Sequence, residues 1–211
     1  MYVDRMDLAA GLGGAAGLQD GVTKLGDLRK GVKGYLGQTL LRSYAYPNKF
    51  VVMGRWENVE AAWEFSSSDI LASFLKQMPS DASAITRTRF EGYDSVIEVN
   101  ADPSPSFDDA RCEVFADWIL ASVGKVAEFE QSRRELFALQ LANIEGFVSA
   151  RLRRSAGIPT KYLMLGIFRD KAAAQGGQGI PPLRDFVASH PAANYANVPP
   201  SIEAYAVVHR M

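Results

Sequence analysis

The amino-acid sequence repeats itself at a spacing of 112 residues, which constrains the fold more than any other feature. The stretch 34–62 reads GYLGQTLLRSYAYPNKFVVMGRWENVEAA, and 146–174 reads GFVSARLRRSAGIPTKYLMLGIFRDKAAA. This match defines 1–99 and 113–211 as two copies of one unit, too few for a solenoid. We therefore expect one chain that imitates a dimer of single units. The residues that recur unchanged are Gly34, Leu40, Arg42, Ser43, Pro47, Lys49, Gly54, Ala61 and Ala62, as Gly146, Leu152, Arg154, Ser155, Pro159, Lys161, Gly166, Ala173 and Ala174.

Composition narrows the possible partners and the expected location. Lys and Arg (23) balance Asp and Glu (24), so no strong field draws the chain to nucleic acid or to anionic lipid. Cys112 is the single cysteine, which excludes an intramolecular disulfide and favours a reducing compartment. The opening MYVDRMDL is charged where a signal peptide needs an apolar run, and no apolar stretch approaches the roughly 20 residues of a membrane span. We expect a soluble cytoplasmic protein.

Both copies share one order of predicted strands and helices. Alternating apolar residues predict the strands, and apolar residues at helical offsets predict the helices. In the second copy, the Gly and Pro residues of QGGQGIPP are expected to prevent the first of the two short helices from forming. Only 183–189 is then clearly helical. In the first copy we expect a strand at 2–9, a helix over 18–32, strands at 35–42 and 49–56, helices at 57–65 and 69–78, and a strand at 92–99.

The resulting βαββαβ order predicts the α+β class with ferredoxin-like repeats. Each repeat should form an antiparallel sheet with both helices on one face. The other face of such a sheet needs cover, and a second copy can supply it. The segment 100–112, with Pro103 and Pro105, is expected to be an extended linker.

Several motifs resemble the antibiotic biosynthesis monooxygenase family. They are the sequence LLRS at 40–43, the turn containing Pro47, the strand that ends in Trp56, and Glu60 followed by two alanines on a helix. The opening VDRMDL also looks like the first strand of that family. The resemblance covers both copies, and it implies that the two ferredoxin-like repeats form an intramolecular dimeric α+β barrel.

The resemblance implies more than one activity. The family includes cofactor-free oxygenases that act on aromatic polyketides, haem-degrading monooxygenases, and members with no settled role. In the haem-degrading branch the site consists of an Asn on the first strand, a Trp that ends the third strand and a His on the next helix. This sequence has Asp4 and Trp56 at the first two places and no histidine in the first copy, which makes haem degradation the alternative activity.

Asp4 and Trp56 are the main catalytic candidates. Strand alternation places both on the face toward the helices, where a pocket would lie. A carboxylate in an apolar cleft can act as a base toward a phenol. The alternative is a strand-end aspartate in solvent and a core tryptophan. The second copy has Ala116 and Phe168 at these places, so the fold does not require the polar group and a function for it is favoured.

Further side chains are candidates for substrate binding. Trp63 would form an aromatic wall together with Trp56, and Tyr93 would serve as a proton donor. The remaining candidates for lining the pocket are Met53, Phe65 and Phe74.

The Gly- and Ala-rich segment 9–17 has three possible interpretations. GLGGAA after a strand superficially resembles a dinucleotide fingerprint, although a hairpin and not a parallel crossover follows it. Small side chains, where the second copy has bulkier ones such as Phe129, can leave room for a flat polycyclic ligand. A mobile loop is the third interpretation.

His190 is the catalytic candidate of the second copy. Histidine is the usual base near neutral pH, so a separate site could lie there. The alternative is a surface histidine at a helix end. His209 is interpreted as structural, and two histidines with one cysteine match no zinc spacing. Arg42 and Ser43 recur in the second copy, which favours a structural capping role.

These features together predict a small oxygenase of secondary metabolism that acts on an aromatic, polyketide-like substrate. Asp4 would deprotonate a phenol or anthrone, and the carbanion would pass an electron to O2 without a metal or cofactor. Asp4→Asn is then expected to abolish turnover with little loss of stability. Alternatives are reduced flavin from a partner reductase, haem, and a non-catalytic ligand-binding or interaction module; a homodimer is possible.

Overall fold

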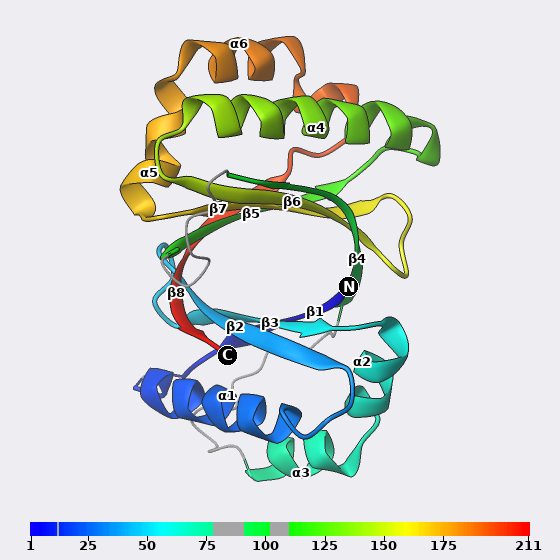
Figure 1. Cartoon of the computed structure of the whole chain (residues 1–211), viewed down its shortest axis with the longest axis vertical. Coiled ribbons are helices and arrows are strands. Elements are labelled where there is room, and N and C mark those ends of the chain that lie inside the picture. The colour runs from blue at the N-terminus through cyan, green and yellow to red at the C-terminus, as the bar shows by residue number, and fades with distance from the viewer. Residues whose placement is uncertain (12, 78–90, 102–109) are drawn as a thin grey trace. The chain divides into compact units, whose positions relative to one another are not determined.

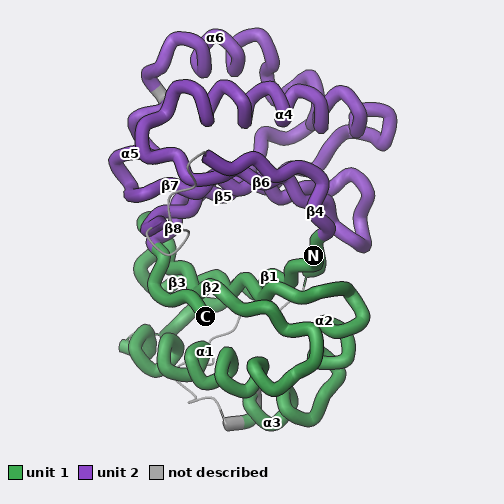
Figure 2. The backbone as a smooth tube through the Cα atoms, viewed as in Figure 1, with its two compact units in different colours: residues 1–93, 207–211 green, residues 94–206 purple. Residues whose placement is uncertain are grey.

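A computed structural model describes residues 1–11, 13–77, 91–101 and 110–211 (Figure 1). The chain forms two compact units, coloured separately in Figure 2. Unit 1 comprises Met1–Tyr93 and Val207–Met211, and unit 2 comprises Asp94–Ala206. The predicted linker falls mostly on 102–109, outside the described residues. The boundaries 1–99 and 113–211, which come from the repeat, stay a prediction.

Unit 1 follows the predicted order of strands and helices. The Gly-rich opening is followed by a helix that begins at Ala15, and Gly13 precedes it with a positive φ of 84°. Asn58 caps the second helix, because its side chain accepts a hydrogen bond from the Ala61 amide at 2.9 Å. The elements are β1 (Tyr2–Ala9), α1 (Ala15–Arg29), β2 (Tyr35–Ser43), β3 (Lys49–Trp56), α2 (Val59–Ser66), α3 (Asp69–Gln77) and the start of β4 (Glu91–Asn100).

Unit 2 repeats this order and corrects one expectation. The first of the two short helices, which Gly and Pro were expected to prevent, does form. It is α5 (Lys171–Gly176), and the 3-10 turn η3 (Gly177–Gly179) follows it. Asp170 caps α5 by accepting from the Ala173 amide at 2.8 Å, as Asn58 does in unit 1. The other elements are β5 (Cys112–Ile119), η2 (Val123–Lys125), α4 (Val126–Asn143), β6 (Phe147–Ser155), β7 (Lys161–Phe168), α6 (Pro181–Ser189), η4 (Ala192–Asn194) and β8 (Ser201–Arg210).

The strands hydrogen-bond in the closed order β1-β3-β2-β8-β5-β7-β6-β4. Within unit 1, β3 pairs antiparallel with β1 and β2, and within unit 2, β5 pairs antiparallel with β7 and β8. Strands β4 and β8 each contribute residues to both units. These observations confirm an α+β fold with eight strands in a closed order, whereas a barrel made by the two repeats facing each other stays a prediction.

Each unit builds an apolar core between its helices and one face of its sheet (Figure 1). In unit 1, β1 sends Tyr2, Met6 and Leu8 into this core, which confirms the predicted alternation. Unit 2 fills its core with larger groups, among them Trp118 and Phe129. Among the described residues, no helix is long and apolar enough to cross a membrane.

Gly34 should resist replacement, because it has a positive φ of 80° and an added Cβ would lie 2.7 Å from the Ala61 Cβ. We expect Gly34→Ala to lower the free energy of unfolding by about 1–3 kcal/mol, as judged by urea denaturation. Gly17 in α1 is the control, because an added Cβ meets nothing within 4 Å there. Gly17→Ala should stabilise by about 0.5–1 kcal/mol. Equal losses in both variants would contradict the expectation.

Candidate functional site

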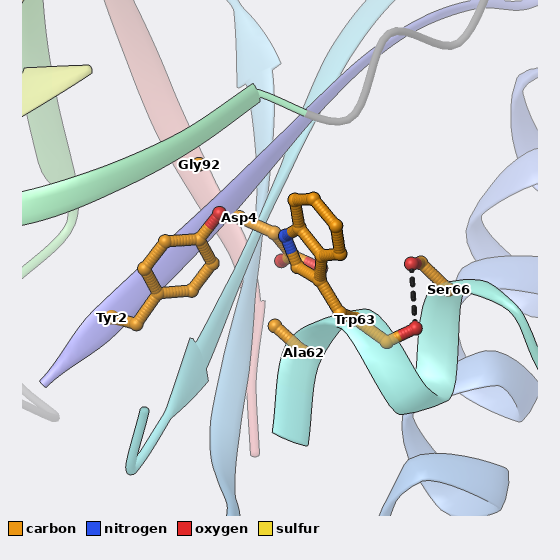
Figure 3. Close-up of a pocket in the computed structure, with 6 residues that line it drawn as sticks. All are labelled: Tyr2, Asp4, Ala62, Trp63, Ser66 and Gly92. Carbon is orange, nitrogen blue, oxygen red and sulfur yellow. Dashed lines mark hydrogen bonds between the residues drawn. The ribbon is translucent and has the colours of Figure 1, made fainter. Parts of the chain in front are cut away.

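A pocket of about 300 Å³ lies in unit 1 between β1, α2 and the start of β4 (Figure 3). This volume is at the lower end of the range for small-molecule sites. The pocket contains one carboxylate, one phenol and one indole, which are the side chains of Asp4, Tyr2 and Trp63. The other lining residues are Ala62, Ser66 and Gly92.

The lining side chains differ in exposure. Asp4 is only 5% exposed, whereas Trp63 is 68% exposed. The Ser66 hydroxyl donates to the Trp63 carbonyl at 2.9 Å in the last turn of α2 (Figure 3). Trp63 therefore offers a flat aromatic surface at the solvent side of the pocket, and the Asp4 carboxylate lies in its protected part.

Asp4 forms a buried ion pair with Arg29, which extends from the last turn of α1. The Arg29 Nη2 donates to Asp4 Oδ2 at 3.0 Å, and the Arg29 side chain is 0% exposed. The Arg29 Nη1 donates to Gln38 Oε1 at 3.2 Å, and Gln38 Nε2 donates to the Val22 carbonyl at 2.9 Å. A buried guanidinium requires such partners, and these bonds fix the orientation of Asp4.

The strand register makes room for this network. Gly54 on β3 is the register partner of both Asp4 on β1 and Gln38 on β2. A Cβ at this position would collide with Asp4 Oδ1 and would lie 2.8 Å from Arg29 Nη1. Gly54 therefore provides the space in which Arg29 can hydrogen-bond to both Asp4 on β1 and Gln38 on β2.

The second carboxylate oxygen of Asp4, Oδ1, lies next to Gly54 on β3. Among the residues that the structure describes, no hydrogen bond is made to Oδ1, although Asp4 lines the pocket. A carboxylate oxygen accepts hydrogen bonds, and when the carboxyl is ionised it can also take up a proton. The arrangement suits a ligand with an acidic O–H or C–H group.

Sequence reasoning missed Arg29 and Gln38, although the repeat contains a signal for both. At the spacing of 112 residues they correspond to Leu141 and Ala150, just as Asp4 corresponds to Ala116. All three polar groups of the network are therefore apolar in the second copy. The comparison that selected Asp4 would have selected its two partners as well.

Trp56 lies behind the ion pair and not on the pocket surface. It is 0% exposed at the end of β3, and its ring centroid is 5.3 Å from that of Tyr35 and 5.4 Å from that of Phe65. The Arg29 guanidinium carbon lies 5.6 Å from the Trp56 ring and 4.9 Å from the Phe65 ring, so both are cation–π partners. Phe74 on α3 belongs to the same core.

Of the five predicted binding residues only Trp63 lines the pocket, since Phe65 and Phe74 lie in the core and Met53 and Tyr93 lie on other faces. Met53 pairs in register with Arg5 and Thr39, on the face of β3 opposite the helix-facing side chains of Phe50 and Val52. Tyr93 is adjacent to the pocket residue Gly92, so its side chain points to the other face of β4. There the Tyr93 hydroxyl donates to Glu91 Oε2 at 2.6 Å.

His190 belongs to unit 2, directly after α6. Its ring stacks on Phe186 with 4.2 Å between centroids and an angle of 13°. Its Nδ1 lies 3.1 Å from the Phe186 carbonyl and 3.1 Å from Ser189 Oγ. The structure therefore places His190 among residues of its own helix.

Unit 2 fills its core with a buried arginine and aromatic rings. The Arg133 guanidinium carbon lies 5.1 Å from the Trp118 ring and 5.1 Å from the Phe129 ring, and burial lowers the pKa of Arg133. Phe129 corresponds to Gly17 in unit 1, around which an added Cβ would find open space. Segment 9–17 thus leaves open space near Gly17, but it does not line the described pocket.

The repeated Arg42 and Ser43 are structural, as predicted. Arg42 Nε donates to the Pro47 carbonyl at 2.7 Å. Ser43 Oγ accepts from the backbone amides of the turn that follows β2, and Ser155 does the same after β6. These bonds confirm the capping role.

No protein-family model and no curated protein sequence matches the chain. Solved structures do resemble it. A candidate monooxygenase from Fusobacterium nucleatum has a TM-score of 0.73 at 12% identity, covering 99% of this chain and 93% of that one. An anthrone oxidase-like protein has a TM-score of 0.69 at 11% identity, covering 100% and 92%. A Listeria monocytogenes ferredoxin-fold protein related to antibiotic biosynthesis monooxygenases has a TM-score of 0.56 at 10% identity, covering 99% and 95%.

These similarities establish a shared fold. Over nearly its whole length, the chain has the ferredoxin-like α+β fold of proteins related to antibiotic biosynthesis monooxygenases.

Proposed function

We propose that the chain is a monooxygenase that oxidises a small aromatic substrate with O2 in the unit 1 pocket. The observation that carries this proposal is the buried Asp4 carboxylate, which lines the pocket near the exposed indole of Trp63 and whose Oδ1 has no hydrogen-bond partner among the described residues. The names of the structural neighbours, which include candidate monooxygenases and an anthrone oxidase-like protein, support it. Haem degradation is less well supported, because the first copy of the repeat, residues 1–99, contains no histidine.

Asp4 would act as the base that deprotonates the substrate, and Arg29 would stabilise the resulting anion. A phenol or anthrone stacked on Trp63 gives a proton to Asp4 Oδ1, so the negative charge moves from the carboxylate to the substrate. The Arg29 guanidinium is then left beside a neutral carboxyl group. Its charge stabilises the substrate anion in a site that is partly shielded from water.

Oxygen would then react with the substrate anion. The carbanion passes one electron to O2, and the resulting substrate radical and superoxide combine through a new C–O bond to form a peroxide. Asp4 returns its proton to the outer peroxide oxygen. The O–O bond breaks as water leaves with the second hydrogen of the same carbon, and a carbonyl group remains. One oxygen atom enters the product and the other enters water, with the substrate as the reductant.

Oxygen uptake by the purified chain with 1,8-dihydroxyanthrone tests this function. We expect one O2 consumed per anthrone and, with ¹⁸O2, one labelled oxygen in the quinone by mass spectrometry. Uptake only after reduced flavin and a reductase are added would reject the cofactor-free form. No uptake above the uncatalysed rate, with or without flavin or haem, would reject the proposed function. A reductase partner, a homodimer and a cytoplasmic location stay predictions.

A further inference from the structure

Tyr2 and Gly92 form a matched pair at the edge of the pocket. Tyr2 on β1 is 6% exposed, and its ring belongs to the unit 1 core. Its hydroxyl occupies the place where any side chain at position 92 would begin, because a Cβ on Gly92 would collide with the hydroxyl and the ring. In Figure 3 this hydroxyl lies on the side of the pocket formed by Gly92 and Asp4.

The backbone does not explain the glycine at position 92. Gly92 lies in strand β4, and its φ is outside the positive range in which glycine is favoured. A larger residue would therefore suit the backbone conformation, and Tyr2 is what excludes it. The glycine serves to seat the tyrosine.

Unit 2 shows that the fold requires neither residue. At the spacing of 112 residues, Tyr2 corresponds to Val114 and Gly92 corresponds to Ala204. Val114 and Ala204 are register partners on β5 and β8. Unit 1 therefore has a tyrosine and a glycine where unit 2 has a valine and an alanine. Of these two pairs, only the tyrosine–glycine pair brings a hydroxyl to a pocket wall.

We propose that Tyr2 is a substrate-recognition residue whose hydroxyl hydrogen-bonds to an oxygen of the aromatic substrate. This inference rests on the proposed function and specifies its substrate class. Tyr2 and Asp4 are two residues apart on one face of β1, so their Cα atoms are roughly 6–7 Å apart. Two polar groups in a row along one strand fit an aromatic that carries at least two oxygens along one edge.

Binding of unreactive quinones tests this inference independently of turnover. The readout is quenching of tryptophan fluorescence by 1,8-dihydroxyanthraquinone, which has oxygens along one edge, and by unsubstituted anthraquinone. Tyr2→Phe should weaken binding of the dihydroxyquinone about tenfold, the size expected for one lost hydrogen bond, and should leave anthraquinone binding unchanged. The KM for 1,8-dihydroxyanthrone should rise with it.

Gly92→Ala and the double variant Tyr2→Val/Gly92→Ala separate recognition from folding. Gly92→Ala should displace Tyr2 and weaken dihydroxyquinone binding at least as much as Tyr2→Phe. The double variant copies the unit 2 pair, so it should melt near the wild-type temperature while binding stays weak. Ala204→Gly in unit 2 is the control and should bind as the wild type does.

Three results would overturn the inference. Dihydroxyquinone binding that is unchanged in Tyr2→Phe or in the double variant would remove the proposed hydrogen bond. An equal loss for both quinones would show that Tyr2 only shapes the pocket. If the wild type bound neither quinone but still consumed O2 with another phenol, the substrate class inferred from Tyr2 would fail while the oxygenase proposal survived.

Discussion

Asp4→Asn should reduce oxygen uptake with an anthrone by about 10²- to 10⁴-fold, the range for losing a general base. Asparagine has nearly the shape of aspartate and still offers an oxygen to Arg29, but its amide is not a base at neutral pH. The measurement is the initial rate of O2 consumption, corrected for the uncatalysed oxidation. Binding of 1,8-dihydroxyanthraquinone should change far less than the rate.

Asp7→Asn is the matched control for this substitution. Asp7 lies on the same strand, and its position on β1 places it on the opposite face from Asp4. Its Oδ1 pairs with Arg5 at 3.1 Å, and its side chain is half exposed. We expect wild-type oxygen uptake from Asp7→Asn. Full activity in Asp4→Asn, or an equal loss in both variants, would exclude Asp4 as the base.

Asp4→Ala should lower the free energy of unfolding by about 3–5 kcal/mol. The reason is the Arg29 guanidinium, which is fully buried and would lose its only carboxylate partner among the described residues. The sequence alone led us to expect little loss of stability from neutralising Asp4. The ion pair now predicts a larger loss, because a neutral residue leaves the charge of Arg29 uncompensated in the core.

The second copy provides a design that restores stability without restoring activity. The triple variant Asp4→Ala/Arg29→Leu/Gln38→Ala gives unit 1 the residues found at Ala116, Leu141 and Ala150. Replacing a buried ion pair with apolar residues is often neutral or stabilising, so this variant should recover most of the loss. In a Trp118→Phe background the remaining tryptophans, Trp56 and Trp63, report on unit 1 during urea denaturation. A triple variant as unstable as Asp4→Ala would show that the network is not the cause.

The sequence predicted the fold well because its periodicity and its repeat report on local structure. Strand alternation correctly placed Asp4 and Trp56 on the helix-facing side of the sheet. The same alternation could have placed Met53 on the opposite face, because it is three residues from Trp56. Whether Tyr93 can line the pocket depends in the same way on which residues of β4 face it.

The rest of the site depends on contacts between distant segments. Arg29 contacts Asp4 from the end of a helix whose first residue was hard to predict, because glycines precede it. Tyr2 contacts Gly92, which is 90 positions away in the sequence. Neither contact leaves a periodic signal. Both do leave a difference between the copies, because Leu141, Val114 and Ala204 replace Arg29, Tyr2 and Gly92. In this chain a comparison of the two copies would therefore have added Arg29, Gln38 and Tyr2 to the candidates that periodicity gave.

The division of β8 has a consequence for protein synthesis. Val207–Met211 belongs to unit 1, where the Met211 amide donates to the Gln38 carbonyl at 2.9 Å and the Gln38 amide donates to Met211 at 3.1 Å. Domains usually fold in the order in which the ribosome makes them. Here the edge of β2 in unit 1 stays unpaired until residue 211 has left the ribosome. Unit 2 has all its residues once residue 206 has left the ribosome. We expect nascent chains to protect unit 2 first and the backbone of β2 at Gln38 last.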